Sequence, residues 1–253
     1  MRSAASLLHA LRAECSGLLD LLLPPACPLC GRQLQSGGPA APFCSACQKG
    51  IHPLVSPSCP RCALPFTSDA GSDHHCEACI RKPPPFAWVR AAGLYEDSLR
   101  RAVQRFKYEG AIYLDRALSH LLAQALQGDR ERFCPDLLVP VPLHRSRLRQ
   151  RTFNQALLLA RALGRRWDVP AAADLLERTR PTPAQQGLDA RQRRRNLKGA
   201  FALRRPLAGR RILLIDDVMT TGATARECSA VLLKGGADAV GVAVLGRARR
   251  HLQ

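Results

Sequence analysis

The chain has 253 residues, a hydrophobic share of 46% and a formal net charge of +18. This length accommodates one medium domain and one small domain, and the apolar share is sufficient for a packed core. The positive charge predicts attraction to phosphate-rich partners, either nucleic acid or small metabolites, with a simple solvated basic surface as the alternative.

Residues 1–24 are expected to form an amphipathic N-terminal helix, because leucines recur there at helical spacing. Arg12, Glu14 and Asp20 interrupt this stretch, which excludes a continuous membrane span and a signal-peptide core. The helix is expected to pack on the protein rather than on lipid. A cytoplasmic location follows as an expectation, with reduced cysteines unless a metal holds them.

Residues 25–82 contain four Cys-x-x-Cys pairs that form an internal repeat. In both halves thirteen residues separate the two pairs, which favours two complete units, each with four thiolates around one structural zinc ion. The expected ligand sets are Cys27, Cys30, Cys44 and Cys47 for one zinc, and Cys59, Cys62, Cys76 and Cys79 for the other. An interleaved arrangement, in which the first pair of each unit shares a metal, remains an alternative. Each unit has few apolar residues, so metal binding is expected to drive its folding.

Three consecutive prolines, Pro83–Pro85, end the cysteine-rich block and are expected to form a stiff linker, because proline cannot continue a helix or a central strand. Residues 86–253 then alternate between apolar runs and helical patterns, which predicts an α/β domain with a parallel sheet. Strands are expected at 88–95, 136–142, 211–215 and 239–245, and helices at 98–107, 113–126, 154–166 and 225–234.

The stretch Arg211–Thr224 carries the strongest functional signal. A buried strand is expected to end at two adjacent acids, and a loop of small and hydroxylated residues then leads into a helix. The N–H groups at a helix N-terminus favour a phosphate, whereas carboxylates suit the hydroxyl groups of a sugar. The predicted ligand therefore contains a ribose and a 5′-phosphate, bound by Asp216, Asp217, Thr220, Thr221, Gly222, Ala223 and Thr224.

Two basic segments complete the expected site. The segment Leu143–Thr152 is expected to be a loop at the same edge of the sheet, and its arginines suit a second, larger anion such as pyrophosphate unless they simply face solvent. The polar segment Thr179–Ala200 is expected to be a lid, or alternatively a grip for a nucleic-acid backbone. The candidate residues in the loop and lid are His144, Arg145, Arg147, Arg149, Arg151, Arg191 and Lys198.

Together these motifs resemble the ComF family of competence-type proteins, which join a double zinc ribbon to a type I phosphoribosyltransferase-like domain. The resemblance rests on the cysteine pairs, on FKYEG at 106–110, on FNQ at 153–155, on NLKGAF at 196–201 and on LLIDDVMTTGAT at 213–224. It implies that phosphoribosyl pyrophosphate binds with Mg²⁺, beside two structural Zn²⁺ ions, and that the protein is linked to DNA uptake or DNA utilisation. One departure is visible, because the family usually has glycine where this chain has Thr152, a position that would strain threonine if the turn needs a positive φ.

The resemblance leaves more than one function open. One hypothesis is a phosphoribosyltransferase that acts on an unidentified acceptor, and the alternative is a non-catalytic competence factor that binds single-stranded DNA and uses the fold as a scaffold or sensor. The enzyme activity and DNA binding could also occur in one protein. Implied partners are phosphoribosyl pyrophosphate, single-stranded DNA, and a competence helicase or another uptake protein. Aromatic residues make up only 5% of the chain, so DNA binding is expected to be mainly electrostatic.

Overall fold

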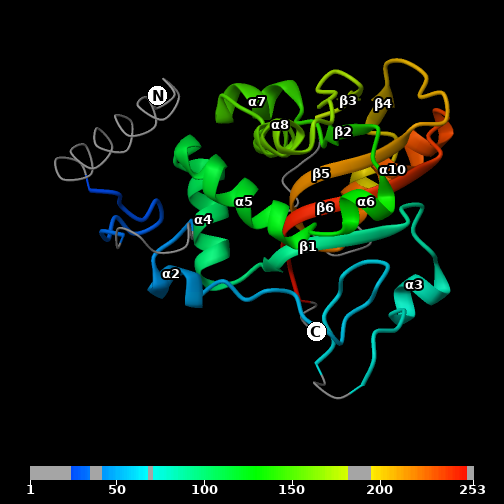
Figure 1. The fold of residues 1–253 in the computed structure, drawn as a ribbon. Coiled ribbons are helices and arrows are strands. Elements are labelled where there is room, and N and C mark those ends of the chain that lie inside the picture. The colour runs from blue at the N-terminus through cyan, green and yellow to red at the C-terminus, as the bar shows by residue number, and fades with distance from the viewer. Residues whose placement is uncertain (1–23, 35–41, 68–70, 182–194, 250–253) are drawn as a thin grey trace, which may run out of the picture.

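The structure is a computed structural model that describes residues 24–34, 42–67, 71–181 and 195–249 (Figure 1). The expected N-terminal helix, Arg191 and most of the expected lid lie outside these residues. Within the described ranges, no helix has the length and apolar character needed to cross a membrane.

A four-stranded parallel sheet forms the centre of the molecule, in the order β1-β6-β5-β2. Its strands are β1 (Trp88–Leu94), β2 (Leu137–Pro140), β5 (Arg211–Met219) and β6 (Ala239–Arg247). The central strands β5 and β6 are largely buried, as expected for a parallel sheet that is covered on both faces. This sheet and the helices that connect it confirm the α/β class predicted from the sequence.

The helices that cover the sheet follow the predicted pattern, with some shifts at their ends. Asn154 caps α8 as expected, because its side chain accepts a hydrogen bond from the backbone N–H of Ala156. The elements are α2 (Ser45–Lys49), α3 (Glu77–Arg81), α4 (Asp97–Tyr108), η1 (Ile112–Leu114), α5 (Asp115–Ala125), α6 (Asp129–Phe133), α7 (Arg145–Arg151), α8 (Gln155–Trp167) and α10 (Ala223–Lys234). A separate antiparallel pair, β3 (Leu176–Arg178) and β4 (Phe201–Leu203), brings the chain out to the expected lid and back.

Two hydrophobic clusters lie on opposite faces of the sheet, since alternate residues of β5 belong to different clusters. Leu213 and Ile215 pack with α4, α5 and α8, whereas Ile212 and Leu214 pack with α10. Each cysteine unit joins a different cluster. The first unit packs beside α4, and the second packs against β1, β6 and α10, so the two units lie at separate places around the α/β domain in Figure 1.

Backbone hydrogen bonds hold the segment that connects the two cysteine units against the α/β domain. The carbonyl of Gly50 accepts a hydrogen bond from the N–H of Ser98, and the carbonyl of His52 accepts one from the N–H of Leu94. A Cβ atom on Gly93 would lie 2.6 Å from the His52 carbonyl oxygen, so this close approach requires glycine. The proline run at 83–85 separates α3 from β1, and the next residue, Phe86, is buried in the shared core.

Two elements differ from the sequence prediction. Strand β5 continues through both acids to Met219, because β6 runs alongside it as far as Arg247 and supplies backbone partners. The expected loop at 143–152 contains the helix α7, for which His144 is the N-cap and accepts a hydrogen bond from the N–H of Ser146. The prediction of a loop was therefore wrong for residues 145–151.

Candidate ribose-phosphate site and zinc sites

A pocket lies where β5 ends and α10 begins. It is lined by Asp216, by residues 218–225 and by Val244 of β6. Gly222 is the N-cap of α10 and has a φ of 76°, and a Cβ atom there would approach the Met219 side chain to 3.1 Å. Glycine is thus favoured at this turn, where the first N–H groups of a twelve-residue helix lie at the pocket. The positive end of the α10 dipole makes this a suitable place for a phosphate group.

The two acids do not share one side of the sheet. They are consecutive residues of β5, so their side chains point to opposite faces, although the N–H of Asp217 donates to Oδ1 of Asp216 over 2.9 Å. Asp216 lines the pocket, whereas Asp217 points towards α4. Of the two acids, Asp216 is therefore the one that faces a ligand in this pocket directly.

Lys107 of α4 holds Asp217 in an ion pair for which the sequence gives no local signal. Its Nζ lies 2.7 Å from Oδ1 of Asp217, and both side chains are only 13% exposed. Burial is the largest single influence on the pKa of Lys107 and lowers it, but the charge and hydrogen bond of Asp217, together with Asp216 and Tyr95, raise it overall. Lys107 belongs to the FKYEG segment, which carried the family resemblance but gave no signal for this role.

Asp216 is a strongly perturbed acid. Burial, and then the neighbouring Asp217 carboxylate, raise the pKa of Asp216 to about 7, although Lys107 and Arg178 act in the opposite direction. A carboxyl group with this pKa changes its charge near neutral pH. Such a group is typical of functional sites, because its charge responds to the arrival of a ligand.

The raised pKa of Asp216 predicts a pH-dependent stability. Between the ordinary value of 3.8 and about 7, the folded chain keeps a proton that the unfolded chain has lost. The free energy of unfolding should therefore decrease as the pH rises through this window. Asp216→Asn removes the titrating group and should flatten this slope in urea unfolding measured between pH 4.5 and 7.5. An unchanged slope in the variant would assign the dependence to other groups.

The arginines of α7 fall into two pairs on opposite sides of the helix, because residues four apart lie on the same side. Arg147 and Arg151 are half-buried, whereas Arg145 and Arg149 are exposed to solvent. Of these four arginines, only Arg147 and Arg151 therefore face the protein. Arg151 donates to Gln155 and to the hydroxyl of Tyr108, which immediately follows Lys107.

Arg178 of β3 brings another guanidinium group to this region. Burial, followed by the proximity of Arg147, lowers the pKa of Arg178, whereas Asp216 acts in the opposite direction. Its Cζ also lies 5.5 Å from the ring centroid of Phe201 on β4. Two guanidinium groups held near each other repel, and an anion bound between them would relieve that repulsion. The sequence gave no signal for Arg178, because its partners come from distant segments.

The turn after α7 has the positive φ on which the expectation of strain at Thr152 depended. Thr152 has a φ of 64°, in the left-handed region where glycine is favoured. The conditional expectation of strain at this position is therefore met.

One described end of the expected lid contacts α10, and the two described ends contact each other. The N–H of Gly199 donates to Oε1 of Glu227 over 2.6 Å, and the Lys198 carbonyl accepts from Arg180. Lys198 is exposed, and its side chain is not among the residues that line the pocket. The geometry thus fixes the base of this segment, which begins and ends at the β3–β4 pair.

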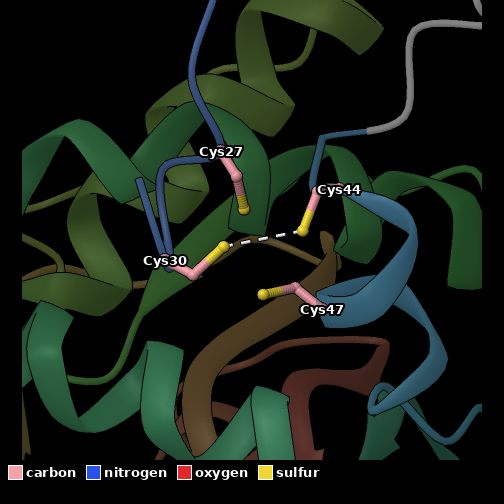
Figure 2. A group of neighbouring side chains, drawn as sticks. All are labelled: Cys27, Cys30, Cys44 and Cys47. Carbon is pink, nitrogen blue, oxygen red and sulfur yellow. Dashed lines mark hydrogen bonds between the residues drawn. The ribbon is translucent and has the colours of Figure 1, made fainter. Parts of the chain in front are cut away.

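The first cysteine unit brings four sulfur atoms together around one point (Figure 2). Those of Cys27, Cys30, Cys44 and Cys47 all lie within 4.8 Å of one another, and the Cys30 and Cys44 sulfurs are 3.6 Å apart. Tetrahedral zinc with Zn–S bonds of about 2.3 Å requires sulfur separations of about 3.8 Å. The unit therefore fits a closed, structural zinc site.

The second unit repeats this geometry with Cys59, Cys62, Cys76 and Cys79, so the interleaved arrangement is excluded. In both units the first pair lies on a tight turn, and the second pair begins at the N-cap of a short helix. Although burial raises their pKa, backbone N–H donors lower it to about 6 for Cys27 and to about 7 for Cys59. The thiolate form is thus stabilised at the first cysteine of both units, whereas burial and the neighbouring cysteines raise the pKa of the last ones, Cys47 and Cys79.

Comparisons with known proteins agree with this architecture. The sequence model of the double zinc ribbon domain matches residues 18–80. The chain is 36% identical over 175 residues to Competence protein F of Haemophilus influenzae, a match that covers 67% of this chain and 76% of that protein. It is 38% identical over 175 residues to the DNA utilization protein YhgH of Escherichia coli K12, covering 66% of this chain and 75% of that protein.

More distant relatives extend the comparison. The chain is 31% identical over 151 residues to Competence protein ComFC of Bacillus subtilis, covering 58% of each protein. Among solved structures, a purine phosphoribosyltransferase from Pyrococcus horikoshii matches with 17% identity and a TM-score of 0.34, covering 51% of this chain and 72% of that one. The family assignment rests on the sequence matches. With its double zinc ribbon and its 36% sequence identity to Competence protein F over three quarters of that protein, this chain belongs to the ComF family.

Proposed function

We propose that this chain binds phosphoribosyl pyrophosphate in the pocket between β5 and α10. The observation that carries the proposal is that Asp216 and the N-terminus of α10 line the same pocket. The helix N-terminus would hold the 5′-phosphate and Asp216 would accept hydrogen bonds from the ribose. Asp217 would support Asp216 from the opposite face of β5, together with Lys107.

The pyrophosphate group would lie towards Arg147 and Arg178. The charge of Arg178 acts on Asp216, and the charge of Arg147 acts on Arg178, so the repulsion between the two guanidinium groups favours a bound anion. Mg²⁺ would accompany the ligand and neutralise part of its charge, while it keeps several water ligands. Displacement of pyrophosphate by an acceptor is the reaction that such a site supports, because it needs positioning and charge stabilisation.

Calorimetric titration of the zinc-loaded chain with phosphoribosyl pyrophosphate and Mg²⁺ tests this proposal. The wild type is expected to bind one molecule per chain, and Asp216→Asn combined with Asp217→Asn should weaken binding at least a hundredfold. Asp238→Asn, at an exposed acid outside the pocket, is the matched control and should bind normally. Equal binding by the double variant would contradict the proposal. Pyrophosphate release with a panel of nucleobases would then distinguish an enzyme from a sensor.

We also propose a second function, binding of single-stranded DNA, on the basis of an exposed aromatic group beside the arginines of α7. Tyr108 is 67% exposed, and the Cζ of Arg151 lies 4.9 Å from its ring centroid. Tyr113 is 57% exposed, and its hydroxyl accepts a hydrogen bond from Arg105. Exposed rings next to guanidinium groups are suited to stack on bases while the cations contact phosphates. The names of the relatives, which refer to competence and DNA utilization, support this second proposal.

Fluorescence anisotropy with a labelled oligothymidylate tests the second function. Affinity should fall steeply with salt concentration, and Tyr108→Ala should weaken binding about tenfold, whereas Tyr108→Phe should not. Binding that is insensitive to both salt and Tyr108→Ala would contradict this proposal. Asp216→Asn with Asp217→Asn should leave DNA binding intact, which separates the two functions.

A further inference from the structure

A buried arginine joins the second zinc site to the phosphate loop, defined here as Thr220–Thr224. Arg247 is the last residue of β6 and is only 3% exposed. Its Nε donates to the carbonyl of Cys62 over 2.9 Å. Its Nη1 donates to the carbonyls of Met219, Thr220 and Ala248 over 3.0, 2.5 and 2.8 Å, respectively.

These contacts determine the orientation of the backbone at the start of the phosphate loop. The carbonyl of Thr220 belongs to the same planar peptide unit as the N–H of Thr221, and in a trans peptide these two groups point in opposite directions. A guanidinium group that holds the Thr220 carbonyl therefore also fixes the direction of the Thr221 N–H. Thr221 lines the pocket, so this orientation concerns a residue at the place where a phosphate would bind.

The other end of the link is a metal ligand. Cys62 is the second cysteine of the tight turn that supplies the first two sulfur ligands of the second zinc site. A bound zinc ion fixes this turn, and with it the carbonyl that Arg247 contacts. A further contact runs in parallel, because Nη1 of Arg226 on α10 donates to the carbonyl of Lys82, immediately after α3 of the same unit.

The first zinc site is connected differently. Arg105 of α4 donates to the carbonyl of Leu29, and Arg101 of the same helix donates to the sulfur of Cys47. These contacts lead to α4 and Lys107, which pairs with Asp217, rather than to the phosphate loop. The first zinc site is therefore connected to α4 and the Lys107–Asp217 pair, whereas the second is connected to the phosphate loop.

We propose that Arg247 is a positioning residue that couples occupancy of the second zinc site to the affinity of the phosphate loop for its ligand. This inference rests on the proposed binding of phosphoribosyl pyrophosphate. Because coupling between two sites is reciprocal, the ligand should also increase the affinity of the second site for zinc by the same factor. Loss of this zinc by chelation would then weaken ligand binding without any change in the pocket residues themselves.

The test measures both directions of the coupling on the full chain. Calorimetry gives the affinity for phosphoribosyl pyrophosphate, and equilibrium competition with a chromogenic chelator gives the zinc affinity with and without this ligand. In the wild type, the ligand should raise the affinity for one of the two zinc ions about tenfold. Arg247→Lys keeps the charge but cannot reach all four carbonyl groups, so it should weaken ligand binding about tenfold and remove the effect of the ligand on zinc affinity.

Arg249→Lys is the matched control, because Arg249 is exposed and pairs with Glu96 at the surface. It should leave both affinities unchanged.

A wild-type chain that binds no phosphoribosyl pyrophosphate rejects the proposed function itself, and this inference with it. A wild type that binds the ligand without any change in zinc affinity rejects the coupling alone. Coupling that survives in Arg247→Lys would run through another contact, such as that between Arg226 and Lys82, and would also reject the role of Arg247. The zinc competition in the wild type requires no variant, so the inference can be tested even if Arg247→Lys does not fold.

Discussion

Cys79→Ser is expected to leave one zinc ion per chain instead of two and to destabilise the whole protein. Cys79 is buried in the same cluster as residues of β1, β6 and α10, so the second unit is part of the main core. Binding of structural zinc contributes about 10–16 kcal/mol in isolated zinc-finger peptides. Loss of even a third of this contribution should lower the melting temperature by about 10 °C or more.

Thermal unfolding and zinc content, measured on the same sample, check this prediction. Cys134→Ser is the matched control, because Cys134 is exposed and belongs to neither cluster of sulfur ligands. The control should retain two zinc ions and melt within a few degrees of the wild type. A Cys79→Ser chain that loses one zinc but melts with the wild type would show that the second unit is independent of the core.

Lys107→Met is expected to destabilise the protein by about 3–5 kcal/mol, because it leaves a poorly solvated carboxylate without its cation. Lys107 and Asp217 are each 13% exposed, and Asp216 adds a second acid next to this pair. Lys107→Met combined with Asp217→Leu removes both charges and should recover most of the loss. A double-mutant cycle in urea measures this coupling energy.

The exposed pair of Arg204 and Glu177 provides the comparison for this cycle. Their side chains are 51% and 40% exposed, so Arg204→Met should change the free energy of unfolding by less than about 1 kcal/mol. Equal effects of Lys107→Met and Arg204→Met would mean that water screens the Lys107–Asp217 pair. In that case the charge of Lys107 would contribute no more to the free energy of unfolding than the charge of an exposed side chain.

The two cysteine clusters and the glycine turn before α10 could be predicted from the sequence because they depend on local sequence. A Cys-x-x-Cys turn requires cysteines at fixed spacing, and a glycine turn at a helix start requires adjacent small residues. Gly222 and Asp216 accordingly line the pocket, and both sets of four cysteines converge as the internal repeat indicated. The parallel sheet was predictable for a similar reason, since buried strands are continuous apolar runs.

The remaining parts of the site could not be predicted because they depend on contacts between distant segments. Lys107 lies at the end of one helix in a basic chain, and nothing local distinguishes it from a solvated lysine. Arg247 appears in the sequence as one of several arginines near the C-terminus, yet it is buried and contacts Cys62 and Thr220. Alternate arginines at 145–151 suggested a loop, but they form a helix that turns two of them towards solvent.

The central claim is that a ribose 5-phosphate group binds between β5 and α10. A crystal structure of the zinc-loaded chain with ribose 5-phosphate tests it most directly. The predicted result is a phosphate within hydrogen-bond distance of the backbone N–H groups of residues 221–224, with a ribose hydroxyl on the Asp216 carboxylate. A ligand bound elsewhere, or a phosphate in this pocket with its ribose directed away from Asp216, would contradict the account.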